Sequence, residues 1–179
     1  NSLTKDILQQ HIRKMVDSSE FVQAGLTKLS AETQKSHQEG KYSFFLDGNG
    51  NCATFFNYQG GCLKDVNKMK MKVDTGMTTK EEVCEELRKA VVACSRTGSS
   101  LVLNLGNTAP DFLNTITDDK EFPANIIFDR AAWRQEENHM KLVKEEENVD
   151  LSGHKGQYVM CMDFQLVLLA TKSDDDTLA

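Results

Sequence analysis

The chain of 179 residues has only two prolines, one tryptophan and no long apolar run. Because a membrane-spanning helix needs about 20 consecutive apolar residues, we expect no such helix here. Cationic side chains are in the minority: 21 Lys and Arg stand against 27 Asp and Glu, giving a net charge of −6. This balance does not favour binding to nucleic acid or to an anionic membrane surface, both of which reward clustered Lys and Arg.

Closely spaced cysteine pairs are also missing. The five cysteines are odd in number and scattered, which argues against the disulfide framework of a secreted protein and favours reduced thiols in the cytoplasm. The four histidines have no C-x-x-C or H-x-x-x-H partner, so no zinc site is predicted. The chain begins at Asn1 without a signal-like apolar segment, and we expect it to be part of a longer protein.

A capped helix followed by an apolar strand is the clearest pattern of the chain. Thr78 and Glu81 have the spacing of a capping box. Apolar residues then recur at three- and four-residue steps over 83–94, and Gly98 suits the left-handed position after a helix. Residues 101–105 (LVLNL) are too few for a helix and apolar on both faces. We therefore predict an interior strand of an α/β sheet.

Other elements are expected on both sides of this pair. Residues 41–47 form a strand candidate, and 164–170 (FQLVLLA) are predicted to be the last interior strand. Residues 126–128 are expected to be another short strand. Residues 131–147 have the composition of a solvated helix.

Two structures remain possible after the Gly-Asn-Gly-Asn cluster at 48–51. The Asn-Gly pair is a hairpin signal, which would make 52–58 a returning strand. Alternatively, Asn51 caps a short helix that ends at the glycine pair 60–61. We favour the helix. Residues 62–73 are then expected to hold a short extended piece around Leu63 and Val66, or one in which Met69, Met71 and Val73 alternate with lysines.

Residues 1–40 are predicted to be a helical arm and linker. The apolar pattern is helical from residue 3 to 37, with a restart near residue 18, and 30–40 read as a fraying end or linker. The arm could pack on the domain or dock onto a partner. Its candidate partner-binding residues are Ile7, Leu8, Ile12 and Met15. Residues 174–179 form an acidic tail.

Signatures of phosphoryl-transfer chemistry are absent. The chain has no G-x-x-x-x-G-K-[ST] loop, whose amides and lysine would hold phosphates. In an ATPase of this architecture the apolar strand ends in acids that hold magnesium, whereas 104–107 read Asn-Leu-Gly-Asn. We predict no enzymatic activity and no cofactor.

A calcium loop is suggested by spacing but not by its key residues. Asp47, Asn49 and Asn51 have the 1-3-5 spacing of an EF-hand, but Cys52 and Tyr58 replace the glycine and the bidentate glutamate. We therefore predict no metal site and interpret this loop as a turn.

The order of elements resembles the AAA+ modules of dynein heavy chains, specifically the late, non-hydrolysing modules. The last strand of that family has the form F-R-L-x-L-x-T-K, matched by 164–172 with one extra residue before Thr-Lys. The motifs that carry the resemblance are YSFFLD (42–47), NCATFFNYQG (51–60), TTKEEVCEELRKAVVACSRTG (78–98), SLVLNL (100–105), NTAPDFLNTI (107–116) and CMDFQLVLLATKSD (161–174). The chain looks closer still to the dynein-like C-terminal region of the IQ-motif and ankyrin-repeat protein family, although it has neither repeat.

This resemblance implies a degenerate, three-layer P-loop/AAA-like α/β domain over 41–173, with a mainly parallel sheet. It also implies a ciliary (axonemal) or cytoskeletal setting in the cytoplasm. The expected function is a non-catalytic interaction or structural module with protein partners. The alternative is a nucleotide-binding domain with little or no hydrolysis, in which residues 48–51 and the following helix contact phosphate.

Overall fold

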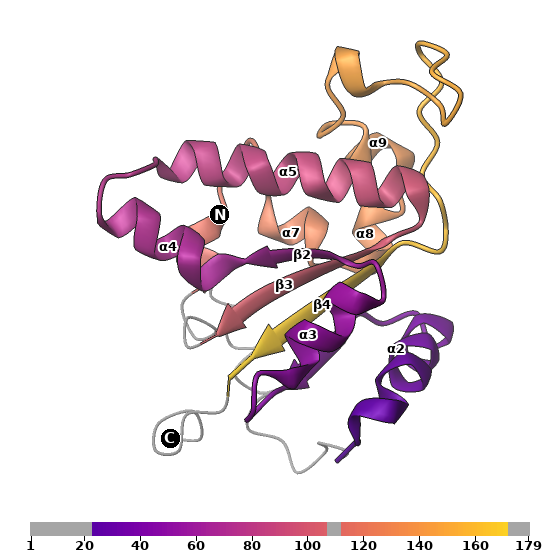
Figure 1. Cartoon of the computed structure of the whole chain (residues 1–179). Coiled ribbons are helices and arrows are strands. Elements are labelled where there is room, and N and C mark those ends of the chain that lie inside the picture. Colours follow the sequence, from indigo (N-terminus) through magenta and orange to yellow (C-terminus); the bar gives the residue numbers. More distant parts are fainter. Residues whose placement is uncertain (1–22, 107–111, 172–179) are drawn as a thin grey trace.

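The structure is a computed structural model that describes residues 23–106 and 112–171. Its four strands, β1 (Ser43–Leu46), β2 (Cys62–Asp65), β3 (Ser100–Gly106) and β4 (Gln165–Ala170), form one sheet in the order β1-β4-β3-β2 (Figure 1). Every pairing is parallel. The predicted α/β class, the parallel sheet and the strand at 101–105 are therefore confirmed.

The two central strands are apolar because both of their faces are covered. Leu101, Leu103 and Leu105 of β3 are fully buried on one face, while Val102 lies with Val167 of β4 in a separate cluster on the other face. A strand buried on both faces has no polar positions to alternate with. This is the reason for the continuous apolar runs in the sequence.

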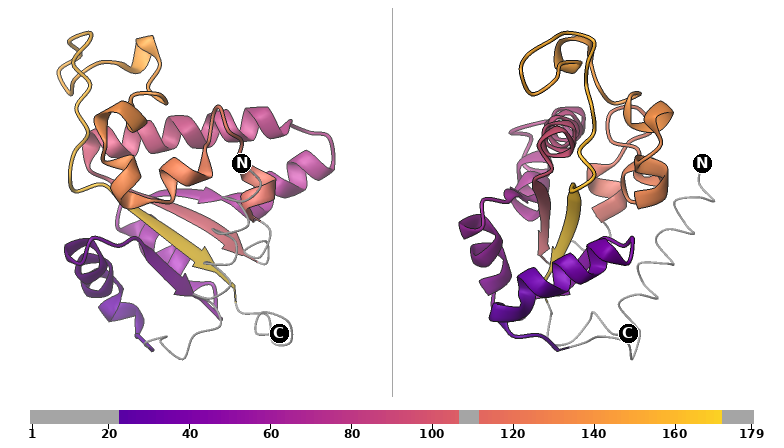
Figure 2. Two further views of the ribbon diagram at one scale, coloured as in Figure 1. Left: turned by 180° about the vertical axis from the view of Figure 1, so that it is seen from behind. Right: turned by 90° about the vertical axis from the view of Figure 1, so that its right-hand side faces the viewer.

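Helices cover both faces of the sheet. The helix α3 (Asn51–Tyr58) connects β1 to the far edge, whereas α4 (Val66–Asp74) and α5 (Lys80–Thr97) lead back from β2 to β3. Between β3 and β4 lie α6 (Phe112–Ile116), α7 (Ala124–Ile127), α8 (Arg130–Trp133) and α9 (Glu136–His139). The chain crosses the sheet in one direction from β1 to β2 and in the other direction from β2 through β3 to β4. Because connections between parallel strands are right-handed, α3 lies on one face of the sheet and the later helices lie on the other. Figure 2 shows the resulting three layers.

The helix α2 (Leu29–Gln38) follows a short 3-10 turn, η1 (Leu26–Lys28). It replaces the fraying end or linker expected at 30–40. Leu29 is buried in the α3-side cluster, and His37 at the other end contacts Arg130 of α8 in the opposite layer. The helix therefore crosses the edge of the sheet beside β1 (Figure 2), which is one way that proteins cover an edge strand.

The segment after β1 is the short helix rather than a returning hairpin strand. Residues 62–65 form the expected extended piece, and α4 starts directly after it. Asn51 is the first helical residue of α3 and not its cap, because Gly50 occupies the N-cap position with a φ of 71°. The capping box of α5 is shifted by one residue from the prediction, to Thr79 and Glu82.

Two predictions between β3 and β4 are wrong. Residues 126–128 are not a strand, because α7 spans Ala124–Ile127. Residues 131–147 are not one helix but α8, α9 and the 3-10 turn η3 (Glu145–Glu147). Trp133 is buried and its indole N–H donates to Ser95 Oγ at 3.1 Å, so packing on α5 breaks the segment into short turns.

None of the helices in the described part of the chain has the length and hydrophobicity that crossing a membrane requires.

Candidate functional site

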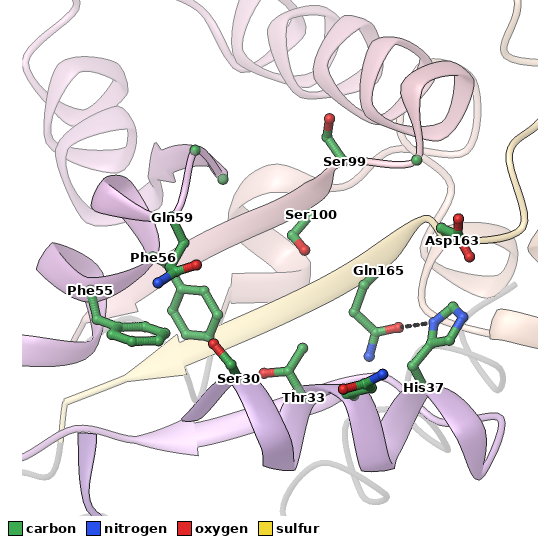
Figure 3. A pocket seen from close by; sticks show the side chains of 14 residues that line it. Ser30, Thr33, His37, Phe55, Phe56, Gln59, Ser99, Ser100, Asp163 and Gln165 are labelled. Carbon is green, nitrogen blue, oxygen red and sulfur yellow. Dashed lines mark hydrogen bonds between the residues drawn. The ribbon is translucent and has the colours of Figure 1, made fainter. Parts of the chain in front are cut away.

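A pocket of about 470 Å³ lies between α2 and α3, at the end of the sheet where β3 and β4 begin (Figure 3). Its volume falls within the range of roughly 300–1,000 Å³ that is usual for ligand pockets. It is lined by α2 (Ser30, Thr33, Gln34, His37), by α3 and the turn after it (Phe55, Phe56, Gln59, Gly60, Gly61), by the turn into β3 (Gly98, Ser99, Ser100) and by Asp163 and Gln165.

The positions of the helix ends create this pocket. Gly98 ends α5 in the left-handed conformation, with a φ of 72°, and the chain turns there into β3. The glycine pair 60–61 makes the equivalent turn from α3 into β2. Small residues therefore line the amino ends of the strands, and α2 closes the remaining side.

One wall of the pocket is aromatic. The rings of Phe55 and Phe56 pack edge to face, with centroids 5.3 Å apart and an interplanar angle of 85°. Phe56 is buried and also packs on Phe45 of β1, with the two ring centroids 5.8 Å apart. Phe55 is only half-buried. Phe56 thus anchors the wall, and Phe55 contributes apolar surface to the pocket.

The opposite wall is polar and held in place by hydrogen bonds. Gln165 is 3% exposed, and its Nε2 donates to Lys41 O at 3.2 Å and to Ser43 Oγ at 3.4 Å. This orientation turns Oε1 towards His37 Nδ1, which lies 2.9 Å away (Figure 3). With Gln165 so oriented, His37 donates to Oε1 in the tautomer that carries the proton on Nδ1.

Arg130 lies behind this polar wall without lining the pocket. Its Nη2 is 3.1 Å from the same His37 Nδ1, and its side chain is 8% exposed. Among the described residues, Arg130 Nε and the Tyr42 hydroxyl are buried and have no hydrogen-bond partner.

The residues proposed to contact phosphate are already engaged within the chain. The Asp47 carboxylate accepts from Asn49 N at 3.1 Å and from Cys52 N at 2.7 Å, so it covers amides at the start of α3. A phosphate there would have to displace an anion of the protein itself. This arrangement weighs against the nucleotide-binding alternative.

The predicted partner-binding residues Ile7, Leu8, Ile12 and Met15 lie outside the described residues, so their role stays a prediction. In the described part of the chain, no group of three or more His, Cys, Asp or Glu residues could hold a metal ion.

Two cysteines far apart in the sequence meet in the fold. A hydrogen bond between Cys62 of β2 and Cys94 of α5 holds the pKa of Cys62 below its usual range and raises the pKa of Cys94. Sequence spacing could not reveal this pair, because the strand and the helix come together only in the assembled sheet.

A buried ionic cluster is centred on Arg88 of α5, which is 1% exposed. Its Nε is 2.6 Å from Glu85 Oε2, its Nη1 is 2.5 Å from Glu147 Oε2, and Nη1 also donates to Leu142 O at 2.5 Å. Lys144 Nζ joins the cluster at 3.0 Å from Glu85. The cluster ties the irregular segment before β4 to α5, which is a structural role.

Comparisons with models of protein families, with curated proteins and with solved structures found no match. The likeness to dynein-type AAA+ modules therefore stays a prediction from the motifs.

Proposed function

We propose that this chain is a non-catalytic protein-interaction module that holds a short segment of a partner protein in the pocket between α2 and α3. The observation that carries the proposal is the pocket itself, which combines one aromatic wall with polar side chains, most of them uncharged and one of them the carboxylate of Asp163.

The lining matches what an extended peptide offers. Ser30, Gln34 and Gln59 are exposed at the rim and can exchange hydrogen bonds with a peptide backbone. Phe55 presents apolar surface for one side chain of the peptide. Recognition of an extended segment by backbone hydrogen bonds plus side-chain pockets is a common mode of protein binding.

Nucleotide binding is the less favoured function. The Asp47 carboxylate accepts from the amides of Asn49 and Cys52, where the alternative would place a phosphate. Both the charge and the hydrogen bonds of a phosphate would compete with this internal contact.

The degenerate P-loop/AAA-like identity of residues 41–173 and the ciliary or cytoskeletal setting are part of the same proposal. Their support is that the motifs of the resemblance fall on β1, α3, α5, β3 and β4, in chain order. The setting itself rests on the resemblance alone.

Filling the pocket should abolish peptide binding. A peptide selected from a displayed random library on the full chain is titrated by fluorescence anisotropy against Ser30→Trp, which places an indole at the rim. We expect the Kd to rise at least tenfold, since the indole and the peptide would compete for the same volume. The matched control is Ala31→Trp, the next, exposed residue of α2, which does not line the pocket.

The control should change the Kd less than about twofold, because exposed substitutions away from a contact are usually near neutral. Peptides whose binding tolerates Ser30→Trp as well as Ala31→Trp, or the absence of any selected peptide, would contradict the proposal.

A further inference from the structure

Arg130 is a buried cation that lacks the compensation seen elsewhere in the fold. The other buried arginine, Arg88, pairs with Glu85 and Glu147. Arg130 is 8% exposed, yet no Asp or Glu in the described part of the chain forms an ion pair with it. A buried charge is expected to be paired, so the difference between the two arginines requires an explanation.

Within residues 23–106 and 112–171, Arg130 has one side-chain polar contact, with His37, and Gln165 competes for the same ring nitrogen. His37 Nδ1 is 3.1 Å from Arg130 Nη2 and 2.9 Å from Gln165 Oε1. If Nδ1 carries the proton it donates to Gln165 and cannot accept from Arg130. If it does not, it faces the carbonyl oxygen of Gln165 instead. A single ring nitrogen cannot both donate to Gln165 and accept from Arg130. His37 is therefore not a full hydrogen-bond acceptor for the guanidinium.

Among the described residues, the charges near this site are mixed: Arg134 opposes the charge of Arg130, whereas Asp129 acts on Tyr42 and accepts hydrogen bonds from amides at the start of α8. Burial lowers the pKa of Arg130, and the charge of Arg134 acts in the same direction. A Cβ at Gly40 would lie 3.4 Å from Arg130 Nη1, so the guanidinium lies near the carboxyl end of α2. That helix end carries only about half a negative charge, so it compensates part of one cation.

The Tyr42 hydroxyl supplies a second unpaired donor. It is buried, has no hydrogen-bond partner among the described residues, and experiences the charge of Arg130. A buried polar atom without a partner in a folded protein often marks a bound water or ion.

We propose that Arg130, together with Tyr42, binds an oxyanion at the junction of α2, β1 and α8. A carboxylate, sulfate or phosphate would accept two parallel hydrogen bonds from the guanidinium fork, including one from the orphaned Nε. It would also neutralise the buried charge. Because Arg130 is 8% exposed, the residue is not fully closed off from solvent. This site is separate from the peptide pocket and does not depend on it.

Thermal unfolding of the full chain at constant ionic strength tests the site. Chloride is replaced stepwise by sulfate, by phosphate, or by N-acetyl-aspartate amide as a model of a protein carboxylate. A ligand that binds only the folded state raises the Tm with its concentration. We expect a rise of about 3–5 °C at ten times the Kd for a domain of this size.

Arg130→Gln should remove the rise, and Lys72→Gln, which removes an exposed cation on α4, should keep it. Should Arg130→Gln not fold, Arg130→Lys keeps the charge without the fork and should weaken the anion response about tenfold. A response to the inorganic anions alone assigns a free oxyanion, and a response to the carboxylate as well shows that the site also accepts a protein side chain. Either supports the site. An equal response in wild type and Arg130→Lys, or no anion response at all, would overturn it.

Discussion

At the scale of single residues, Gly98 is the glycine of the described part of the chain where an added Cβ would make the shortest contact. It adopts a φ of 72°, and a Cβ there would lie 2.6 Å from Cys161 Sγ. It also lines the pocket between α2 and α3. Both the backbone conformation and the close packing therefore favour glycine at position 98.

Gly76→Ala separates these two constraints. Gly76 has a nearly equal φ of 70°, but a Cβ there would meet nothing within 4 Å. Left-handed backbone costs a non-glycine residue about 1–2 kcal/mol, so Gly76→Ala should lower the free energy of unfolding by about 1 kcal/mol. Gly98→Ala should lower it by about 2–3 kcal/mol because the Cys161 thiol must also move.

Urea unfolding of both variants measures the difference. Adding Cys161→Ala to Gly98→Ala removes the clashing sulfur and should recover about 1 kcal/mol. Equal losses in the two single variants would show that the contact with Cys161 is not limiting.

At the scale of elements, α5, with 18 residues, is the longest helix in the described part of the chain. Its buried face, from Val83 to Ser95, packs on the sheet, and Gly98 ends it. At its start, Thr79 Oγ1 accepts from Glu82 N at 3.2 Å, and the Glu82 carboxylate accepts from Thr79 N at 3.0 Å. The reciprocal bonds satisfy two amides that have no partner inside the helix.

Alanine substitutions should distinguish this cap from the one that the spacing predicts. Thr79→Ala should cost about 1 kcal/mol of unfolding free energy, the usual loss for an N-cap threonine. Thr78→Ala removes only an exposed hydroxyl that donates to Glu82 Oε2 at 2.7 Å. It should therefore cost only a few tenths of a kcal/mol of unfolding free energy. Chemical denaturation measures both, and a larger loss in Thr78→Ala would place the cap one residue earlier.

At the scale of the whole molecule, the Arg88 cluster joins parts that the sheet does not hold. It connects α5 to Glu121 and to the segment that contains Lys144 and Glu147. The Arg88 guanidinium holds the pKa of Glu85 below its usual range. For Glu147, burial acts to raise the pKa, but Arg88 outweighs it and the pKa is lowered.

These shifts make part of the stability dependent on pH. Carboxyl groups whose folded pKa is lowered stabilise the fold above their unfolded pKa, about 4.3 for Glu, and this stabilisation is lost as the pH falls through the lower, folded values. We expect Arg88→Met to cost about 3 kcal/mol at pH 7, since the half-buried Glu147 loses its guanidinium partner and Glu85 keeps only its lysine neighbours.

The difference in the free energy of unfolding between wild type and Arg88→Met should become smaller as the pH falls below about 4. Denaturation between pH 3 and 7 measures it. Lys89→Met is the control, because Lys89 is exposed and 3.5 Å from Glu85, and such surface pairs contribute little. A loss in Arg88→Met that does not vary with pH would contradict an ionic origin.

How much of this protein can be predicted from sequence depends on the range of the interactions. The spacing at 78–98 predicts a capped helix, with the cap one residue too early, and the runs at 101–105 and 164–170 predict interior strands. These patterns express contacts within a few residues or burial on both faces. The same patterns predict the α/β class. The prediction of one helix over 131–147 is wrong. The composition of this segment favours a helix, but Trp133 is buried against α5 and the segment forms short turns.

The candidate sites depend on contacts between residues far apart in the sequence, which local patterns do not reveal. The pocket joins residues from 30 to 165, and Arg130 approaches His37 only after α2 has crossed the edge of the sheet. An arginine inside a polar segment has no sequence signature of burial, and an unpaired charge becomes visible only when all its neighbours are known. The sequence by itself therefore determined the α/β class and the central strands, through helical periodicity and continuous apolar runs. Only the tertiary structure decided which polar groups are buried together, because that depends on contacts between segments far apart in the chain.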